Sequence, residues 1–349
     1  MPKRVNTKWI NADHDEYHYP HSDKVLRALR KRRALQDMIS CYHRKSDLIR
    51  FVAKKSDLPT SAFFLEHGIE GIIHTVYSGL KKGSKILLPE LGYTLYHKLA
   101  EAYEMKIDTF KFIKGNDRFD YDYNNLLQKL KAKPDMVVLI DPEVPLGFSI
   151  PNYMLEDIFR TVSQETLVLL DEAHRGFRQE NEKDIPSLVK KCPNLLIAKG
   201  YSKFYGLCGL RLAEGWCGEN AKKMISYKER VLGFDILSQL IAIACLESEQ
   251  HYQDNSRLIH EQKTRFYAEI EKLSVYKTYE TDTEFALVEV PEEMTQMLLE
   301  QAKKQNIGIR HIADYHKELV NIVKITICRQ ADMNRIIDLF SSLTRAYQR

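Results

Sequence analysis

A repeated alternation of short apolar runs and longer amphipathic stretches limits the possible fold more than any other feature of the sequence. The apolar runs have strand length and lie at 62–65, 85–88, 107–112, 136–140, 167–170, 194–197 and 212–216. Stretches with a helical period separate several of them, at 68–80, 93–103 and 153–162. Strands that alternate with helices form mainly parallel sheets. We therefore expect an α/β domain whose ligands gather where strands end and helices begin.

The last third of the chain has a different pattern. A long helical region follows Ser226 and continues to about Leu273, so it is expected to link two domains. Strand candidates at 285–290, 307–310 and 322–327 and helices near 293–305 and 332–343 predict a smaller α+β domain. The N-terminal arm is expected to pack with it. We expect the arm over 1–45, the large domain over 46–228, and the linking helix with the small domain over 229–349.

Length and charge exclude some classes of function. A chain of 349 residues suits one large and one smaller domain. Its 52 Lys and Arg residues are nearly matched by 48 Asp and Glu, which leaves a net charge of +4 and little support for nucleic-acid binding. The basic runs at 27–33 and 129–133 are interpreted as solvated helix faces.

The cysteine spacing and the apolar segments indicate in which cellular compartment the protein is expected. The six cysteines, at positions 41, 192, 208, 217, 245 and 328, show no CxxC spacing, which favours reduced thiols in a cytoplasmic protein. The sequence starts without the apolar core of a signal peptide. The longest mostly uncharged stretch, 236–246, is shorter than the roughly 20 residues that span a bilayer and predicts a buried helix. We expect no membrane association.

A metal site is not expected. His14, His18 and His21 lie in a polar arm, but no HExxH or comparable ligand set accompanies them. Nucleotide sites are also poorly supported, because no GxGxxG follows a strand and 79–85 does not form a GxxxxGK[ST] loop.

An acid, a lysine and an arginine occur in an order that suits pyridoxal 5'-phosphate. Asp171 ends an apolar run, Lys203 lies in a loop of glycines and aromatics, and Arg211 follows eight residues later. A lysine amine can form a Schiff base with the cofactor aldehyde, and a carboxylate can keep the pyridine nitrogen protonated. Arginine and a helix N-terminus bind phosphate. Lys203, Asp171, Arg211 and the helix that starts at Gly68 supply one group each.

Two motifs carry a resemblance to a known family. The sequence DEA at 171–173 and SKFYGLCGLR at 202–211 are similar to those of fold-type I pyridoxal-phosphate enzymes with the aspartate-aminotransferase fold. The chain resembles aminotransferases of the histidinol-phosphate and threonine-phosphate-decarboxylase type from about residue 40 to the C-terminus. The resemblance implies that Lys203 is the Schiff-base lysine and proton shuttle, Asp171 partners the pyridine nitrogen, and Arg211 and Ser202 lie at the phosphate.

The resemblance also assigns two tyrosines. Tyr93 would stack on the cofactor ring, and Tyr42 would reach the phosphate of the neighbouring subunit. The second assignment implies a homodimer with shared active sites. Ordinary core or surface tyrosines remain the alternative for both positions.

Several positions depart from the family. Val144 replaces the Asn of Asn-Pro-Thr-Gly, and His174 replaces the Tyr after Asp-Glu-Ala, so both contacts to the phenolic oxygen change. Gly200 stands at a phosphate-binding Ser position. At Gly68 and Ile69 the alignment is ambiguous by one residue, and either register loses the usual Ser or Thr.

Lys324 departs from the family at the position that binds the substrate carboxylate. It stands where the family arginine grips the substrate α-carboxylate, and it lacks the bidentate fork of arginine. It could pair with a carboxylate as a point charge or be a strand lysine without a role. An unusual substrate is therefore possible.

Three functions follow from these residues. The first is an aminotransferase for an amino acid or related small amine, acting through Lys203. The second is a decarboxylase or lyase of the same fold, which the changes at Val144, His174 and Lys324 favour. The third is a non-catalytic binding protein, against which the retained Lys203 argues.

Overall fold

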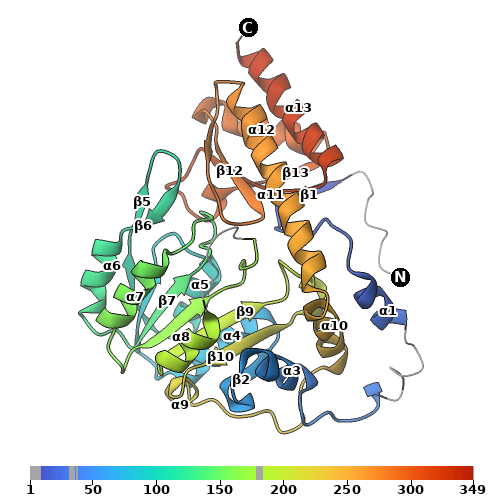
Figure 1. Cartoon of the computed structure of the whole chain (residues 1–349). Coiled ribbons are helices and arrows are strands. Elements are labelled where there is room, and N and C mark those ends of the chain that lie inside the picture. Colours follow the sequence, from blue (N-terminus) through green and yellow to red (C-terminus); the bar gives the residue numbers. More distant parts are fainter. Residues whose placement is uncertain (1–8, 31–35, 37, 178–183, 349) are drawn as a thin grey trace.

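The computed structural model describes residues 9–30, 36, 38–177 and 184–348 of the chain. Figure 1 shows a lower body built around a large sheet and an upper body built around a smaller sheet, with the C-terminus at the top. The long helix α11 (Glu249–Glu271) runs along one side from the lower body to the upper body.

Within the described residues, the large sheet has seven strands in the order β2-β10-β9-β8-β7-β3-β4. All neighbours are parallel except β10, which is antiparallel to β2 and to β9. The strands span Phe63–Glu66 (β2), Lys85–Pro89 (β3), Lys106–Phe110 (β4), Met136–Ile140 (β7), Leu167–Asp171 (β8), Leu195–Gly200 (β9) and Ala213–Cys217 (β10).

Both faces of the large sheet are buried, because successive side chains of a strand point to opposite faces. Along β8, Val168 and Leu170 join the core that continues into the small sheet. Leu167 and Leu169 join the other core, beneath α4 (Gly68–Gly79) and α5 (Thr94–Ala102). The alternation therefore directs Asp171 toward α5.

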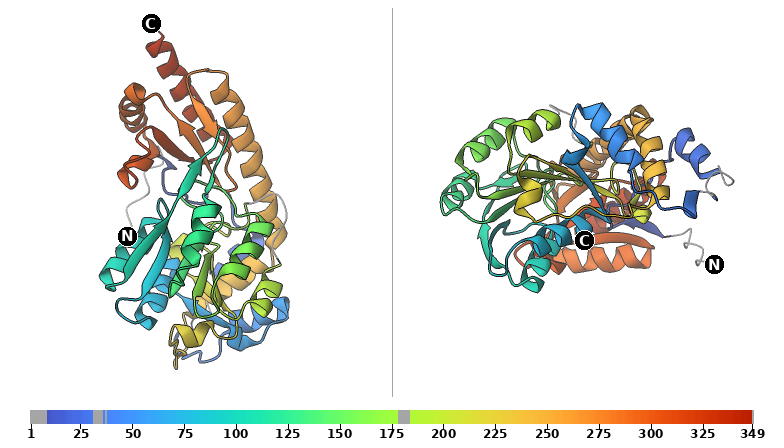
Figure 2. Two further views of the ribbon diagram at one scale, coloured as in Figure 1. Left: turned by 90° about the vertical axis from the view of Figure 1, so that its left-hand side faces the viewer. Right: turned by 90° about the horizontal axis from the view of Figure 1, so that it is seen from below.

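Further helices surround the large sheet and its edges. They are α3 (Asp47–Ser56), α6 (Tyr123–Leu130), α7 (Asn152–Thr161), α8 (Ile185–Lys191) and α9 (Ala221–Met224), and Figure 2 shows their arrangement from two sides. Short 3-10 turns lie at Thr60–Ala62, Cys208–Leu210 and Ile312–Asp314.

The smaller sheet, counted over the described part of the chain, has five strands in the order β1-β13-β14-β12-β11. They span Ile10–Ala12 (β1), Lys277–Tyr279 (β11), Phe285–Glu289 (β12), Ile307–His311 (β13) and Ile322–Thr326 (β14), and helices α12 (Glu292–Lys304) and α13 (Gln330–Tyr347) pack beside it. Strand β1 pairs parallel to β13, whereas the other pairs are antiparallel. The residues after β1 are thereby brought to the carboxyl edge of the large sheet.

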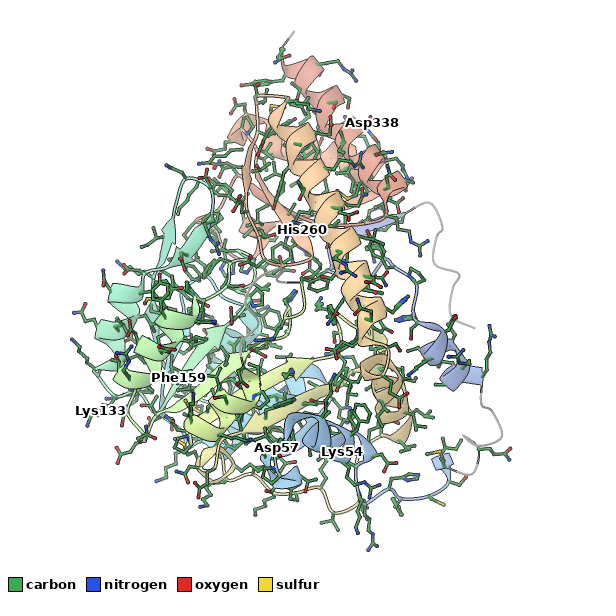
Figure 3. The ribbon with its side chains drawn as sticks, viewed as in Figure 1. Lys54, Asp57, Lys133, Phe159, His260 and Asp338 are labelled. Atoms are coloured by element: carbon green, nitrogen blue, oxygen red, sulfur yellow. The ribbon has the colours of Figure 1, made fainter. Side chains whose placement is uncertain are left out.

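The predicted fold class is confirmed: a mainly parallel α/β sheet is combined with a smaller α+β sheet. The predicted helical region from Ser226 is wrong at its start and middle. Helix α10 (Ile236–Leu246) begins ten residues later, where the Asp235 carboxylate caps the backbone N–H groups of Leu237 and Ser238. Helix α10 ends at Leu246, and α11, on which Figure 3 labels His260, begins at Glu249.

A second correction concerns the run 107–112. Strand β4 ends at Phe110, and Phe112–Lys114 (β5) forms a separate hairpin with Phe119–Tyr121 (β6). The first basic run lies partly on α1 (Asp23–Arg30), where Arg27 and Arg30 are exposed, and its residues 31–33 lie outside the described part. The six cysteines are free thiols. Among the described helices, none combines the length and apolar character needed to cross a bilayer.

Candidate active site

A cavity of about 500 Å³ lies where the parallel strands β7, β8 and β9 end, between the large sheet and the strands β13 and β14. Its wall includes most of the residues singled out from the sequence: Ile69, Tyr93, Val144, Asp171, His174, Ser202, Lys203, Arg211 and Lys324. Segments far apart in the sequence therefore converge at the carboxyl edge of the large sheet, as expected for a parallel sheet.

Asp171 forms the buried end of this cavity. Its Oδ2 accepts a hydrogen bond from the Tyr96 hydroxyl at 2.7 Å, and its Oδ1 accepts from the Ala173 N–H at 2.9 Å. Burial raises the pKa of Asp171 above its usual value, against these two hydrogen bonds and the nearby His174. A cation bound in the cavity would favour the charged form of the Asp171 carboxylate. A protonated pyridine nitrogen is such a cation.

Lys203 reaches the cavity from the loop that follows β9. Its Nζ donates to the backbone carbonyls of His14 at 3.2 Å and Asp15 at 3.1 Å. These neutral acceptors can release the amine at modest cost. Buried Tyr201 and Phe204 anchor the loop on either side of Lys203. The amine is thus placed for covalent linkage to an aldehyde.

An anion cradle borders the same cavity at the N-terminus of α4. Gly68 has φ +72°, and the preceding residue makes no capping hydrogen bond with its side chain among the described contacts. A Cβ added at Gly68 would lie 2.8 Å from Arg211 Nη2, so the guanidinium rests directly on the glycine. Arg211 Nη2 otherwise lies 3.7 Å from the Glu70 carboxylate. Free helix N–H groups together with an arginine fit a phosphate.

His174 is held in place by Glu284, a residue that the sequence analysis did not identify. The imidazole Nδ1 lies 2.9 and 3.0 Å from the two Glu284 oxygens, and both side chains are buried. A carboxylate only accepts hydrogen bonds, so Nδ1 donates and Nε2 is left for the cavity. The contact with Glu284 therefore fixes the orientation of the His174 ring.

Lys324 is buried and already paired. Its Nζ donates to Oδ2 of Asp15, a residue that the sequence analysis also missed, and its ammonium lies 4.6 Å from the centroid of the Phe285 ring. Burial alone would raise the pKa of Asp15, but Lys324, Lys203 and His174 hold it below its usual value. The lysine therefore carries a protein carboxylate as its counterion.

Asp15, His174 and Glu284 also bring one potential metal ligand each within 4.8 Å of one another. Asp15 already carries the Lys324 ammonium, and Glu284 accepts from His174, so we assign no metal here.

The two predicted tyrosines occupy different places. Tyr93 precedes α5 at the cavity mouth, 42% exposed, with its ring 6.3 Å from that of Tyr96. Tyr42 is 76% exposed and lines a separate hollow with His43, His67 and Phe234. Within one chain, Tyr42 therefore does not belong to the wall of this cavity.

The profile of the family described as "Aminotransferase class I and II" matches residues 8–340. The histidinol-phosphate aminotransferase of Chlorobium limicola is 26% identical over 285 residues, which cover 80% of this chain and 76% of the relative.

Two solved structures have a similar fold. The histidinol-phosphate aminotransferase of Sinorhizobium meliloti, solved in complex with pyridoxal-5'-phosphate, has a TM-score of 0.85 and 19% identity over 97% of this chain and 91% of its own. The L-threonine-O-3-phosphate decarboxylase of Porphyromonas gingivalis has a TM-score of 0.80 and 17% identity over 96% and 99%. Because the family profile spans nearly the whole sequence, the chain belongs to the class I and II aminotransferases and is a pyridoxal-phosphate-dependent transferase.

Proposed function

We propose that this chain transfers the amino group of an amino acid or related small amine, with Lys203 as the residue that links to the cofactor. The observation that supports this most is that Lys203, Asp171 and the Arg211 cradle border a single cavity. When bound, pyridoxal phosphate supplies an aldehyde for linkage to an amine and a ring that accepts electrons from the substrate carbon.

Different side chains of the protein would then have different roles. The Asp171 carboxylate, fixed by Tyr96, accepts the pyridine N–H and keeps that proton on the nitrogen. Arg211, with the backbone N–H groups at Gly68 and Ile69, holds the phosphate. The Lys203 Nζ, as a free amine, would take the proton from the substrate carbon.

The remaining wall residues would orient the ring. Tyr93 would stack on the ring, and Ser202 would contribute on the phosphate side. His174 would be the polar group available to the phenolic oxygen, whereas Val144 would offer that oxygen no hydrogen bond. Of these four positions, all but Val144 would thus contribute contacts that a bound cofactor can use.

We also propose a homodimer located in the cytoplasm. The exposure of Tyr42, together with that of Ile39, Val231 and Leu232, supports a contact surface between two copies, across which Tyr42 reaches the partner's phosphate. The arm over 1–45, the large domain over 46–228 and the linking and small domain over 229–349 remain part of this proposal.

The visible spectrum of the purified protein tests the role of Lys203. Wild-type protein supplied with pyridoxal phosphate is expected to show the absorption of the lysine-linked cofactor, and Lys203→Ala is expected to lose it. Lys98→Ala is the matched control, because Lys98 lines the same cavity and has no assigned role. Equal absorption in Lys203→Ala and wild type would rule out the assignment.

A decarboxylase or lyase is the second candidate. It is favoured by the unusual wall at Val144, His174 and Lys324, where the contacts to the ring oxygen and the substrate differ from those of the family. Amino-acid panels distinguish the candidates: transamination leaves an oxo product and an aminated cofactor, whereas decarboxylation releases carbon dioxide and retains the amine.

A further inference from the structure

Among the lysines and arginines that line the cavity in the described chain, Lys324 alone is buried. Lys98 and Arg211 are exposed, and Lys203 and Arg310 are partly buried. A buried cation gives the strongest electrostatic interaction with a substrate carboxylate, since little solvent screens it. The partner of Lys324 therefore decides whether such a carboxylate can bind on this side of the cavity.

That partner is the Asp15 carboxylate, and it is rigidly held. Its Oδ2 accepts from Lys324 and its Oδ1 accepts from the Thr326 hydroxyl at 3.0 Å, while the same hydroxyl accepts from the Asp15 N–H at 3.0 Å. The pairing of β1 with β13 fixes the segment before Asp15. Asp15 is therefore part of the cavity wall and is not a loosely associated counterion.

We infer that Asp15 is a specificity-determining residue that takes the place of a substrate carboxylate, so that the preferred amine carries no carboxylate on its amine-bearing carbon. This inference rests on the proposed function. It also argues against decarboxylation at this carbon, because such an amine has no carboxylate to lose.

Two physical costs exclude a second carboxylate. If it joins Asp15 at Lys324, two like charges share one ammonium in a poorly solvated place. If it displaces Asp15, that side chain is left buried without its cation, because its position is fixed by Thr326 and by the strand before it. A neutral group at the same place meets neither cost.

Arg310 does not offer an equivalent place for this carboxylate. Its Nε donates to the Asp13 carbonyl at 3.1 Å, and its Nη1 donates to the Tyr315 hydroxyl at 3.0 Å. Its guanidinium carbon also lies 5.4 Å from the centroid of the Tyr315 ring. These contacts hold the Arg310 guanidinium next to Tyr315. It is therefore better placed to bind a part of the substrate far from the amine-bearing carbon.

The first test measures binding of probes that have no amine and cannot react. Propionate and 3-phenylpropionate are titrated into the holoenzyme calorimetrically, beside the matched alcohols propan-1-ol and 3-phenylpropan-1-ol. Asp15→Asn is expected to tighten carboxylate binding at least about tenfold, or ~1.4 kcal/mol, and to leave alcohol binding unchanged. Asp13→Asn is the matched control, because Asp13 lines the same cavity and does not contact Lys324 in the described structure.

A double variant assigns the gain to the proposed pair. In Asp15→Asn/Lys324→Met the carboxylate affinity is expected to return to the wild-type level, because the freed cation is gone. No tightening in Asp15→Asn, or equal tightening in Asp13→Asn or in the double variant, overturns the inference. Circular dichroism confirms that each variant is folded.

The second test measures reaction. Alanine, phenylalanine and lysine are compared with ethylamine, phenethylamine and cadaverine through loss of the lysine-linked cofactor absorption. Wild type is expected to favour the amines, and Asp15→Asn to raise the rate constants of the amino acids at least about tenfold. A wild-type preference for amino acids overturns the inference. Failure to form the lysine-linked absorption contradicts the proposed function instead, and titration of the same carboxylate and alcohol probes into the cofactor-free protein and its variants then decides the role of Asp15.

Discussion

Replacing Gly68 by alanine tests the anion cradle most directly. The residue has φ +72°, a conformation that costs a residue with a Cβ about 1–2 kcal/mol. The new Cβ would also lie 2.8 Å from Arg211 Nη2, closer than side chains approach, so the guanidinium must move away. Since the guanidinium is the flexible end of its side chain, moving it is easier than moving the helix.

The displacement should weaken cofactor binding more than it weakens the fold. Losing one charge-assisted hydrogen bond to the phosphate costs about 1.5–3 kcal/mol, which corresponds to a Kd for pyridoxal phosphate roughly 10 to 150 times higher. The backbone strain predicts in addition a loss of about 1–2 kcal/mol in the free energy of unfolding. Fluorescence titration with the cofactor and denaturant unfolding of the cofactor-free protein measure the two effects separately.

Gly209→Ala provides the control in the same loop as Arg211, because a Cβ added there meets nothing within 4 Å. Its cofactor affinity should equal that of wild type. If Gly68→Ala loses stability but binds pyridoxal phosphate within about threefold of wild type, the phosphate does not lie at the start of α4 and the reasoning is refuted.

Three further predictions concern groups around the same cavity. Arg211→Lys keeps the charge but loses the bidentate fork, so cofactor affinity should fall about tenfold, and unchanged affinity in the same titration contradicts the assignment. The raised pKa of Asp171 means that the folded, cofactor-free protein binds the Asp171 carboxyl proton more tightly than the unfolded chain does. The contribution of Asp171 to stability is therefore present at low pH and is lost as the pH rises through the pKa of the folded state. The melting temperature of Asp171→Asn relative to wild type should therefore increase as pH rises from 4 to 8, and a constant difference contradicts the shift. Glu284→Gln weakens the contact that orients the His174 ring and should slow the half-reaction about tenfold with little change in cofactor affinity, whereas an unchanged rate would show that this contact does not serve the reaction.

The sequence predicts the parts of the site that depend on short-range order. Asp171 follows an uninterrupted apolar run, and Lys203 follows the next strand along the chain. Because β8 and β9 are adjacent and parallel, their carboxyl ends meet, and the two residues lie at the same edge of the sheet. The residue pattern and the sheet type are sufficient for this result.

The partners that tune these residues could not be predicted in the same way. Asp15 and Lys324 are 309 positions apart, and they meet only because β1 pairs with β13 next to β14. Tyr96 reaches Asp171 across the packing of α5 on the sheet, and no periodic pattern specifies that contact. The break in the predicted strand at Lys111 likewise depends on the separate hairpin of β5 and β6.

The position of strand β1 has a consequence for how this protein can change during evolution. The short segment behind it supplies Asp15 to Lys324 and two carbonyl groups to Lys203, whereas Asp171, Arg211 and the start of α4 belong to the large sheet and its helices. Asp15, the residue that we propose sets substrate choice, therefore lies in a different stretch of the chain from Asp171, Arg211 and the start of α4. We expect that exchange of a few residues after β1 changes which amine the enzyme prefers and leaves Asp171, Arg211 and the start of α4 in place.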